Sequence, residues 1–310
     1  MSTKAPIHSN SVGTDTAPIS SSRLTRKHWG AVVGGIGALS LIALMGFVLM
    51  RDGNPTVRTT SQKAELIRVY SPTTKFVFWI GAAEVTQSEF AEFLSSTGGG
   101  RTDAARAIAY ANPAERELPV VVKWNDAKAF VTWLTERDRR AGILSEDFYY
   151  DLPTDQEWSY AAGGGIEDSS KSPKARGESQ PENVFPWGTG SLPAGVNVLR
   201  RGDTNPPPPT STFDGTDGSV GRRPVKMGEV TSGLYDLAGN VAEWTASAYE
   251  GGNEFDSKVS RTIRGGFYGS VALSELRLGS RRAGAPDQDI DGVGFRIACR
   301  KNLPKELSPK

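Results

Sequence analysis

The chain has 310 residues, and its 36 lysines and arginines nearly balance its 35 aspartates and glutamates, so the net charge of +1 provides no field that would attract nucleic acid. Its single cysteine, Cys299, excludes an intramolecular disulfide. Its two histidines, His8 and His28, lie near the N-terminus, so the rest of the chain lacks the commonest metal ligand and the commonest general base.

The N-terminal part of the chain divides into a polar tail, an apolar segment and a polar linker. Residues 1–28 are rich in Ser and Thr without an apolar period, which is typical of disorder. Residues 29–50 hold no charged side chain. A helix over them would be about 33 Å long, enough to cross a hydrocarbon core of about 30 Å. The sequence therefore predicts a transmembrane helix over 29–50 and a linker over 51–63.

Basic residues flank the predicted span mainly on its N-terminal side. Arg23, Arg26 and Lys27 precede it, whereas Arg51 is accompanied by Asp52. Because basic flanks stay in the cytoplasm, we expect a single-pass cell-membrane protein with a cytoplasmic N-terminus and an extracytoplasmic domain, which is periplasmic if the host is bacterial. A cleaved signal peptide is the alternative, but the apolar core is long and no small-residue cleavage site follows it.

Residues 64–303 form the predicted globular domain, and residues 304–310 a short tail. The apolar and β-branched content of residues 75–86 predicts a strand. A helix is predicted to follow Thr86, because Thr86 and Glu89 form a capping-box pattern. Its buried face is predicted to carry Phe90, Phe93 and Leu94.

A further strand and two helices are predicted between residues 119 and 165. The segment 119–140 reads as a strand followed by a helix with Asn125 as its N-cap. The buried stripe of this helix is predicted to comprise Ala129, Phe130, Trp133 and Leu134. Thr154 and Glu157 form a second capping-box pattern, which predicts a helix ended by glycines 163–165. Trp158 and Ala161 are expected to face inward.

Regular structure becomes sparse after this helix. Residues 166–232 are loop-rich, and loops of this length are usually functional or disordered. The remainder reads as short strands and tight turns. A few short helices with many short strands predict a compact α+β domain.

Six ordered motifs between residues 65 and 302 carry a resemblance to a known family. They are ELPVVVKWNDAKAFVTWL, LPTDQEWSYAA, FPWG, GLYDLAGNVAEWT, RTIRGGF and LRLGSRRAGAPDQDIDGVGFRIAC. In this order they resemble the formylglycine-generating enzyme family, also called the sulfatase-modifying factor family. The resemblance implies an irregular α+β fold related to C-type lectins.

The same resemblance bears on catalysis. Aerobic members of the family oxidise a sulfatase cysteine to formylglycine with copper(I) held by two cysteines after the RGG motif. Aligned on Arg264, Gly265 and Gly266, those two positions fall on Ser270 and Glu275. Copper(I) selects soft thiolates, whereas a hydroxyl and a carboxylate are hard ligands. We therefore expect no copper, no formylglycine-generating activity and no catalytic residue at these positions.

The remaining chemistries lack their donors as well. A second branch of the family uses histidine-ligated iron, and the domain has no histidine, so we expect no iron. Cys299 lies in the terminal GFRIAC segment, where the role of a small buried apolar residue is favoured. A nucleophilic Ser270 with a lysine base is an alternative that no spacing supports.

The resemblance also implies two structural calcium sites with oxygen ligands. What we call the strand site comprises Asp236, the Gly239 and Val241 carbonyls, and Glu243. What we call the loop site comprises Asn197, the Val198 carbonyl, Asp217 and the Ser219 carbonyl. The alternative for the strand site is that Asp236 caps a turn and that Glu243 pairs with an arginine, such as Arg281 or Arg282.

Other charged residues of the motifs are expected to be structural. They are Arg264, Arg277, Arg281, Arg296, Asp289 and Asp291. Buried arginine–carboxylate pairs that hold irregular backbone are the favoured interpretation, and an anionic ligand groove is the alternative.

Two functional hypotheses follow from the missing thiols and histidines. The favoured one is a membrane-anchored, non-catalytic domain that binds or scaffolds a protein or peptide partner, with no nucleic acid involved. The alternative is an enzyme of the same superfamily with a different, unassigned chemistry. A ligand-display protein of variable sequence on this fold stays open as a third hypothesis.

Overall fold

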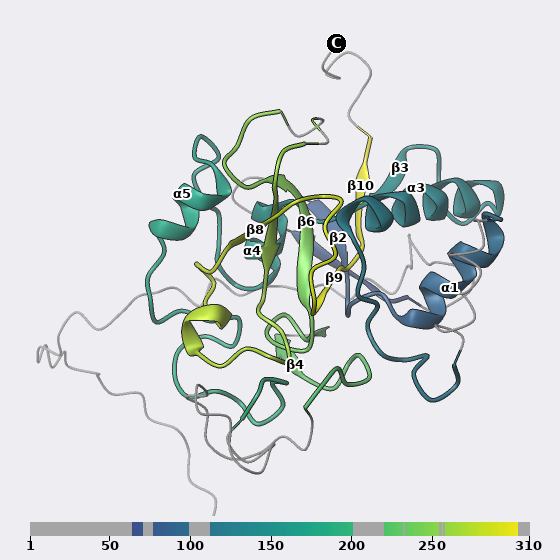
Figure 1. Ribbon diagram of the computed structural model, residues 1–310. Helices are drawn as coiled ribbons and strands as arrows, with labels where there is room; N and C mark the ends of the chain where they lie inside the picture. The colour runs from purple at the N-terminus through teal and green to yellow at the C-terminus, as the bar shows by residue number, and fades with distance from the viewer. Residues whose placement is uncertain are drawn as a thin grey trace, which may run out of the picture. The chain divides into compact units, whose positions relative to one another are not determined.

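A computed structural model describes residues 64–70, 77–98, 112–200, 220–231, 233–253, 256 and 258–302 (Figure 1). The predicted tail, transmembrane helix and linker over 1–63 lie outside the described residues, as does the tail over 304–310. None of the helices in the described ranges combines the length and the apolar character that a membrane crossing requires.

The first sheet has four strands in the order β1-β2-β10-β3, and every neighbouring pair is antiparallel. Its strands are β1 (Leu66–Tyr70), β2 (Val77–Gly81), β3 (Phe148–Asp151) and β10 (Ala298–Lys301). β2 lies within the segment for which the sequence predicts a strand. The last described strand, β10, therefore lies inside this sheet, between β2 and β3, whereas β1 and β3 are its edge strands.

The second sheet has the order β8-β7-β6-β9, with β6 and β9 parallel. Its strands are β6 (Ala242–Ala248), β7 (Arg261–Arg264), β8 (Arg282–Gly284) and β9 (Val293–Gly294). A separate two-stranded sheet pairs β4 (Glu229–Thr231) with β5 (Leu234–Tyr235). These strands are short, as predicted for the C-terminal half of the chain.

Two helices begin where their capping boxes predict. The helix α1 (Gln87–Ser96) follows the N-cap Thr86, whose hydroxyl accepts the Glu89 backbone N–H while the Glu89 side chain accepts the Thr86 backbone N–H. Thr154 and Glu157 make the same reciprocal contacts at α4 (Asp155–Ala161). The inward-facing residues predicted for both helices are buried. Two shorter helical segments are α5 (Pro173–Glu178) and the 3-10 helix η1 (Leu273–Leu276).

The longest helix, α3 (Trp124–Arg140), corrects two predictions. Its N-cap is Lys123 rather than Asn125, whose backbone N–H donates to the Pro286 carbonyl from inside the first turn. Ala129 is exposed, and the buried alanine is Ala127. Ala127 shares a face with the buried Phe130 and Leu134 because they are three and seven positions apart, whereas Ala129 points to the opposite side.

The strand predicted before α3 is irregular. The backbone N–H of Val120 donates to the Val85 carbonyl, and that of Val122 donates to the Val293 carbonyl. These partners belong to different segments, so the apolar run 119–122 connects them instead of forming a continuous ladder with one neighbour.

One apolar core joins both sheets to α1 and α3, which lie side by side in Figure 1. The Phe90 and Phe130 rings stack at 5.6 Å, and Phe295 packs edge-on against both. Trp244 of β6 and Cys299 of β10 belong to the same buried cluster. This core packs the two sheets together, and charged residues of the motifs lie in β6, β7, α4 and the loops beside them.

Candidate functional site

The turn after β7 carries the two positions at which the resemblance implies a thiol pair. Gly265 and Gly266 open it with φ angles of 94° and 69°. A Cβ on Gly266 would lie 2.5 Å from Leu276 Cδ2 and 3.1 Å from Ser270 Oγ. Only glycine therefore fits between β7 and η1, and the backbone at residue 266 approaches the Ser270 hydroxyl closely.

Both replacement side chains at this turn hold backbone. Ser270 is fully buried, and its Oγ accepts the Phe267 backbone N–H at 3.1 Å. Glu275 Oε1 accepts the backbone N–H groups of Val271 and Ala272, each at 3.1 Å. The two positions form a hydrogen-bonded turn and offer hard oxygen atoms in place of sulfur.

Cys299 lies in the centre of the first sheet and is buried, as the sequence predicts. Burial raises the pKa of its thiol to about 12. Because the thiolate is the nucleophile and the metal ligand, this cysteine is held in its unreactive form.

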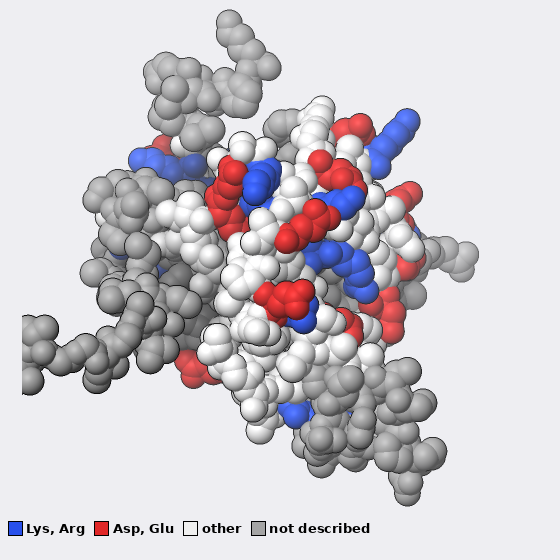
Figure 2. Space-filling model, turned by 90° about the vertical axis from the view of Figure 1, so that its left-hand side faces the viewer, with Lys and Arg blue, Asp and Glu red and all other residues white. Residues whose placement is uncertain are grey.

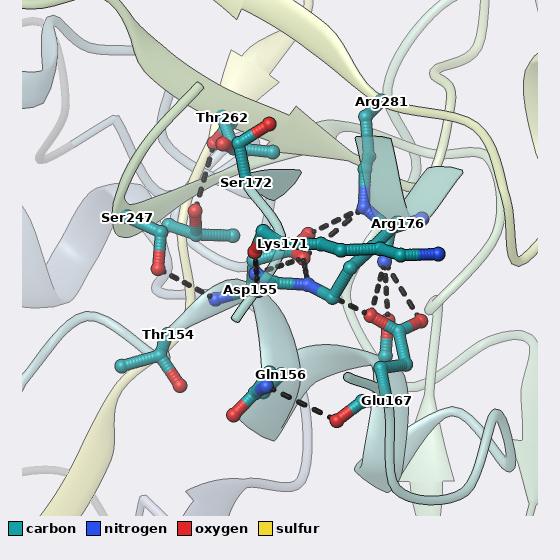
Figure 3. Close-up of polar contacts among 12 residues, drawn as sticks. Thr154, Asp155, Gln156, Glu167, Lys171, Ser172, Arg176, Ser247, Thr262 and Arg281 are labelled. Carbon is teal, nitrogen blue, oxygen red and sulfur yellow. Dashed lines mark hydrogen bonds and ion pairs between the residues drawn. The ribbon is translucent and has the colours of Figure 1, made fainter. Parts of the chain in front are cut away.

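A buried charge cluster surrounds Asp155, the first residue of α4 (Figure 3). Its carboxylate pairs with Arg264 Nη1 at 2.5 Å, Arg176 Nη2 at 2.9 Å and Arg281 Nε at 3.0 Å. Burial alone would raise the pKa of Asp155, but the guanidiniums, that of Arg264 above all, outweigh it and hold the pKa below its ordinary value. Asp155 is therefore a permanent anion that joins three distant segments.

Glu167 supplies the second carboxylate of this cluster. It lies 2.6 Å from Arg281 Nη2 and 3.1 Å from Arg176 Nε. The Ser159 hydroxyl accepts hydrogen bonds from both Arg264 and Arg281. The predicted structural role of Arg264 and Arg281 as buried partners of carboxylates is confirmed.

The acidic motif residues Asp289 and Asp291 are not the partners of these arginines. Both are exposed; Asp289 pairs with Lys123 at 3.2 Å, and Asp291 accepts the Tyr268 hydroxyl at 3.0 Å. Arg277 is partly exposed and lies 3.8 Å from Glu182.

The side chains of the predicted strand site contact protein donors. Glu243 accepts hydrogen bonds from Arg296 Nε at 2.7 Å, from Arg296 Nη2 at 2.6 Å and from the Trp158 indole at 2.9 Å. Asp236 accepts the backbone N–H groups of Lys226 at 2.8 Å and Gly228 at 3.1 Å. This arrangement is the turn-and-arginine alternative, with Arg296 in place of Arg281 or Arg282, and it leaves the two carboxylates a poor fit for calcium.

The backbone that joins Asp236 to Glu243 lies against the predicted loop site. A Cβ on Gly239 would lie 2.3 Å from the Asn197 carbonyl oxygen, and the Asn240 backbone N–H donates to that oxygen at 2.9 Å. Val241 and Val198 are buried. The structure thus brings the described residues of the two sites together.

Asn197 is the loop-site residue whose surroundings fit a cation. It is buried, and its Nδ2 donates to the Gly221 carbonyl at 2.9 Å and to Asn240 Oδ1 at 3.1 Å. Within the described ranges its Oδ1 is buried without a hydrogen-bond partner, and such an oxygen suits calcium. Asp217 and Ser219 lie outside these ranges, so calcium stays a prediction. Within the same part of the chain, no group of three or more acidic, cysteine or histidine side chains is arranged to hold a metal.

The family model of the Sulfatase-modifying factor enzyme 1-like domain matches residues 41–301, most of the chain. The chain belongs to this family. It is 34% identical over 201 residues to the Inactive C-alpha-formylglycine-generating enzyme 2 of Mus musculus, covering 61% of this chain and 52% of that protein. It is 26% identical over 277 residues to the Formylglycine-generating enzyme of Bos taurus, covering 72% and 65%.

A solved structure, PvdO from Pseudomonas aeruginosa, is also similar, with a TM-score of 0.48 and 22% identity over 80% of this chain and 88% of that one. The chain spans about half the length of the mouse relative. The resemblance to the sulfatase-modifying factor family and the α+β class predicted from the sequence are confirmed.

Sequence reasoning missed Asp155 and Glu167 as the acidic centre of this family member. Asp155 could be predicted only as a first-turn acidic residue that the helix dipole favours, because its arginine partners come from distant segments. Glu167 gave no sequence signal, since it lies in an irregular segment and contacts Arg281 only through the fold.

Proposed function

We propose that this sulfatase-modifying-factor-like domain is non-catalytic and binds or scaffolds a protein or peptide partner outside the cytoplasm, where the segment 29–50 anchors it in the membrane. The observation that carries the proposal is the chemistry of the turn after β7. Ser270 and Glu275 stand at the positions of the implied thiol pair, and both are engaged in holding backbone N–H groups.

The remaining thiol cannot replace that pair. Cys299 lies in β10 of the first sheet, whereas the turn follows β7 of the second sheet. The proposal is supported by the similarity to the mouse relative, which is named as an inactive formylglycine-generating enzyme. These observations support recognition without oxidation.

One described face of the domain favours a protein partner over a nucleic acid. The face in Figure 2, which is the left-hand side of Figure 1, carries acidic and basic side chains interspersed among uncharged ones. A nucleic-acid surface would gather basic side chains on one face, whereas mixed polar and apolar surfaces are ordinary in protein interfaces.

The catalytic part of the proposal is tested with the full-length chain in detergent. It is incubated aerobically with a sulfatase-type peptide containing Cys-x-Pro-x-Arg, and aldehyde formation is followed by mass spectrometry. A formylglycine-generating enzyme such as that of Streptomyces coelicolor is the positive control. We expect no conversion. Conversion above the no-protein blank, or stoichiometric copper or iron in the native protein, would support the enzymatic alternative.

The anchor and the partner are tested in cells. Protease added outside intact cells or spheroplasts should digest the domain, and the protein should resist alkaline extraction from membranes. Cross-linking in the native host should capture a partner protein with the full-length chain. A chain truncated after residue 63, which lacks the domain, should not capture it. A soluble, protease-protected domain would contradict the proposed location.

A further inference from the structure

A cavity of about 540 Å³ opens beside the start of α1. Its walls come from the segment before β1, from the end of β2 and the residues after it, from the first turn of α1, and from segments 116–117 and 225–226. Ile297, just before β10, closes one side. The volume lies in the range of pockets that hold small ligands or side chains, and the site is separate from the turn after β7.

The lining combines apolar walls with acidic groups. The apolar contributors are Ala64, Ala83, Val85, Val225 and Ile297. The acidic contributors are Glu65, Glu84, Glu89 and Glu117. Such a lining suits a ligand that has a hydrocarbon stem and a positive end.

The two basic side chains at the cavity are paired with the more exposed glutamates. Arg116 lies 3.0 Å from Glu117, and Lys226 lies 3.6 Å from Glu65. All four side chains are between 42% and 61% exposed, which places them at the rim. No ion pair within 4 Å is formed by Glu84 or Glu89 in the described part of the chain.

Glu84 is the deepest of the acidic groups. The residue is 3% exposed, and its Oε1 accepts a hydrogen bond from Asn240 Nδ2 at 3.2 Å. Among the described residues its Oε2 is buried without a hydrogen-bond partner. A buried polar atom that lacks a hydrogen-bond partner is unfavourable, so a donor that reached this oxygen would be bound favourably.

Glu89 lies at the first turn of α1 on the same cavity. Its Oε2 accepts the Thr86 backbone N–H at 2.6 Å and the Thr86 hydroxyl at 2.9 Å. These contacts fix the side chain, and neither donor is a cation. The two inner carboxyls therefore come from different elements and are both held in place before any ligand arrives.

We infer that this cavity receives an alkylammonium group, such as the end of a lysine side chain, with Glu84 and Glu89 at the ammonium and the apolar walls around the methylene stem. An ammonium carries three donors and no acceptor, which matches two carboxyl groups that form no ion pair within the described ranges. This inference names a ligand chemistry for the proposed binding function and rests on that function.

The pKa values of the two carboxyls determine what accompanies the binding of the ammonium. Burial raises the pKa of Glu84 well above its ordinary value, and the nearby carboxylates of Asp236 and Glu243 add to this rise. Arg296 acts in the opposite direction. Burial likewise raises the pKa of Glu89 to about 7, with Glu117 adding to the rise and Thr86 and Lys226 opposing it. A bound ammonium would favour both carboxylates, so its binding should release protons.

The test is isothermal titration calorimetry on the full-length chain with three probes. Nα-acetyl-lysine methylamide represents a peptide side chain, and 1,5-diaminopentane represents a free amine. Nα,Nε-diacetyl-lysine methylamide has the same stem without the charge. We expect at least one cationic probe to bind, and the diacetylated probe to bind at least about tenfold more weakly. The tighter of the two cationic probes identifies the source of the amine.

Two variants connect the binding to the cavity. Glu84→Gln and Glu89→Gln should each weaken the cationic probe by about tenfold or more, and the Glu89→Gln chain keeps a capping-box residue at its position and so keeps its fold. The matched control is Glu146→Gln, whose side chain is 83% exposed outside the cavity; it should bind as the unchanged chain does.

The inference is overturned if neither cationic probe binds, if the diacetylated probe binds equally well, or if neither cavity variant weakens binding. If the calorimetry gives one of these results while a partner is captured and no peptide is oxidised, only the assignment of the cavity to an alkylammonium group is refuted. Oxidation of the sulfatase-type peptide would instead refute the proposal that the domain is non-catalytic.

Discussion

Arg296 holds the carboxylate of Glu243 through two hydrogen bonds, from Nε to Oε2 at 2.7 Å and from Nη2 to Oε1 at 2.6 Å. Both side chains are almost completely buried, and Arg296 also donates to the Gly81 and Tyr235 carbonyls. One guanidinium thus links β6, the end of β2 and β5, so the pair is a junction of the fold rather than a reactive group.

Replacing Arg296 should therefore be costly. Arg296→Met leaves Glu243 buried without its cation, and we expect the free energy of unfolding to fall by about 3–5 kcal/mol. Urea denaturation followed by tryptophan fluorescence measures this change. The control Arg140→Met alters an exposed arginine at the end of α3 and should stay within about 0.5 kcal/mol of the unchanged chain. Equal effects of the two substitutions would contradict the junction.

The turn after β7 should respond to substitution in stability and not in binding. Ser270→Ala removes the acceptor of the Phe267 N–H in a buried place, which should lower the free energy of unfolding by about 1–3 kcal/mol. Capture of the partner should be unchanged at a temperature where the variant is folded. Loss of partner capture by a folded Ser270→Ala chain would place this serine in the binding surface.

Calcium should stabilise the chain through the loop site. Because an ion that binds the folded state raises the unfolding temperature, calcium should raise the midpoint of thermal unfolding over that in chelator. Asn197→Ala, which removes a buried Oδ1 that has no hydrogen-bond partner among the described residues, should abolish this rise. Asn302→Ala, at an exposed position, should retain it. A rise that persists in the Asn197 variant would show that the ion binds elsewhere.

The stability of the domain should depend on pH through Glu89. Its pKa is about 7 in the fold against an ordinary 4.5, so between these values the unfolded chain has released a proton that the folded chain keeps. The free energy of unfolding should therefore fall as pH rises through this window and level off above it. Urea denaturation at about pH 5 and at about pH 8 measures this fall. The free energy of unfolding should fall less between the two pH values in the Glu89→Gln variant than in the unchanged chain. The same fall in both proteins would refute the assignment.

The thiol of Cys299 should not react in the native protein. With its pKa raised to about 12 by burial, it has almost no thiolate near neutral pH, and the sheet covers it. A thiol reagent such as dithionitrobenzoate should therefore label the chain only after guanidinium has unfolded it. Rapid stoichiometric labelling of the native chain would show that β10 is more accessible than the structure indicates.

Local signals in the sequence predicted the local features well. The capping boxes at Thr86 and Thr154 gave the starts of α1 and α4, because both reciprocal contacts form within four residues. Asn125 misled because a good capping residue has no effect once Lys123 already ends the extended segment and Trp124 is helical.

Features that depend on distant segments were harder to predict. Arg281 and Glu167 are 114 positions apart in the chain, and no spacing in the sequence relates them. The acidic cavity likewise gathers residues from segments spread between Ala64 and Ile297. Motif order identified the family, but only the fold shows which arginine meets which carboxylate.

The position of β10 between β2 and β3 has a mechanical consequence. β1 and β10 both run antiparallel to β2, so they run parallel to each other on its two sides. Tension applied between the chain before Leu66 and the chain after Lys301 would pull these strands in opposite directions along their lengths. The interstrand hydrogen bonds lie perpendicular to the strands, so this force would load them in shear. They would have to break together, whereas a force that peels one strand from its end breaks them one after another.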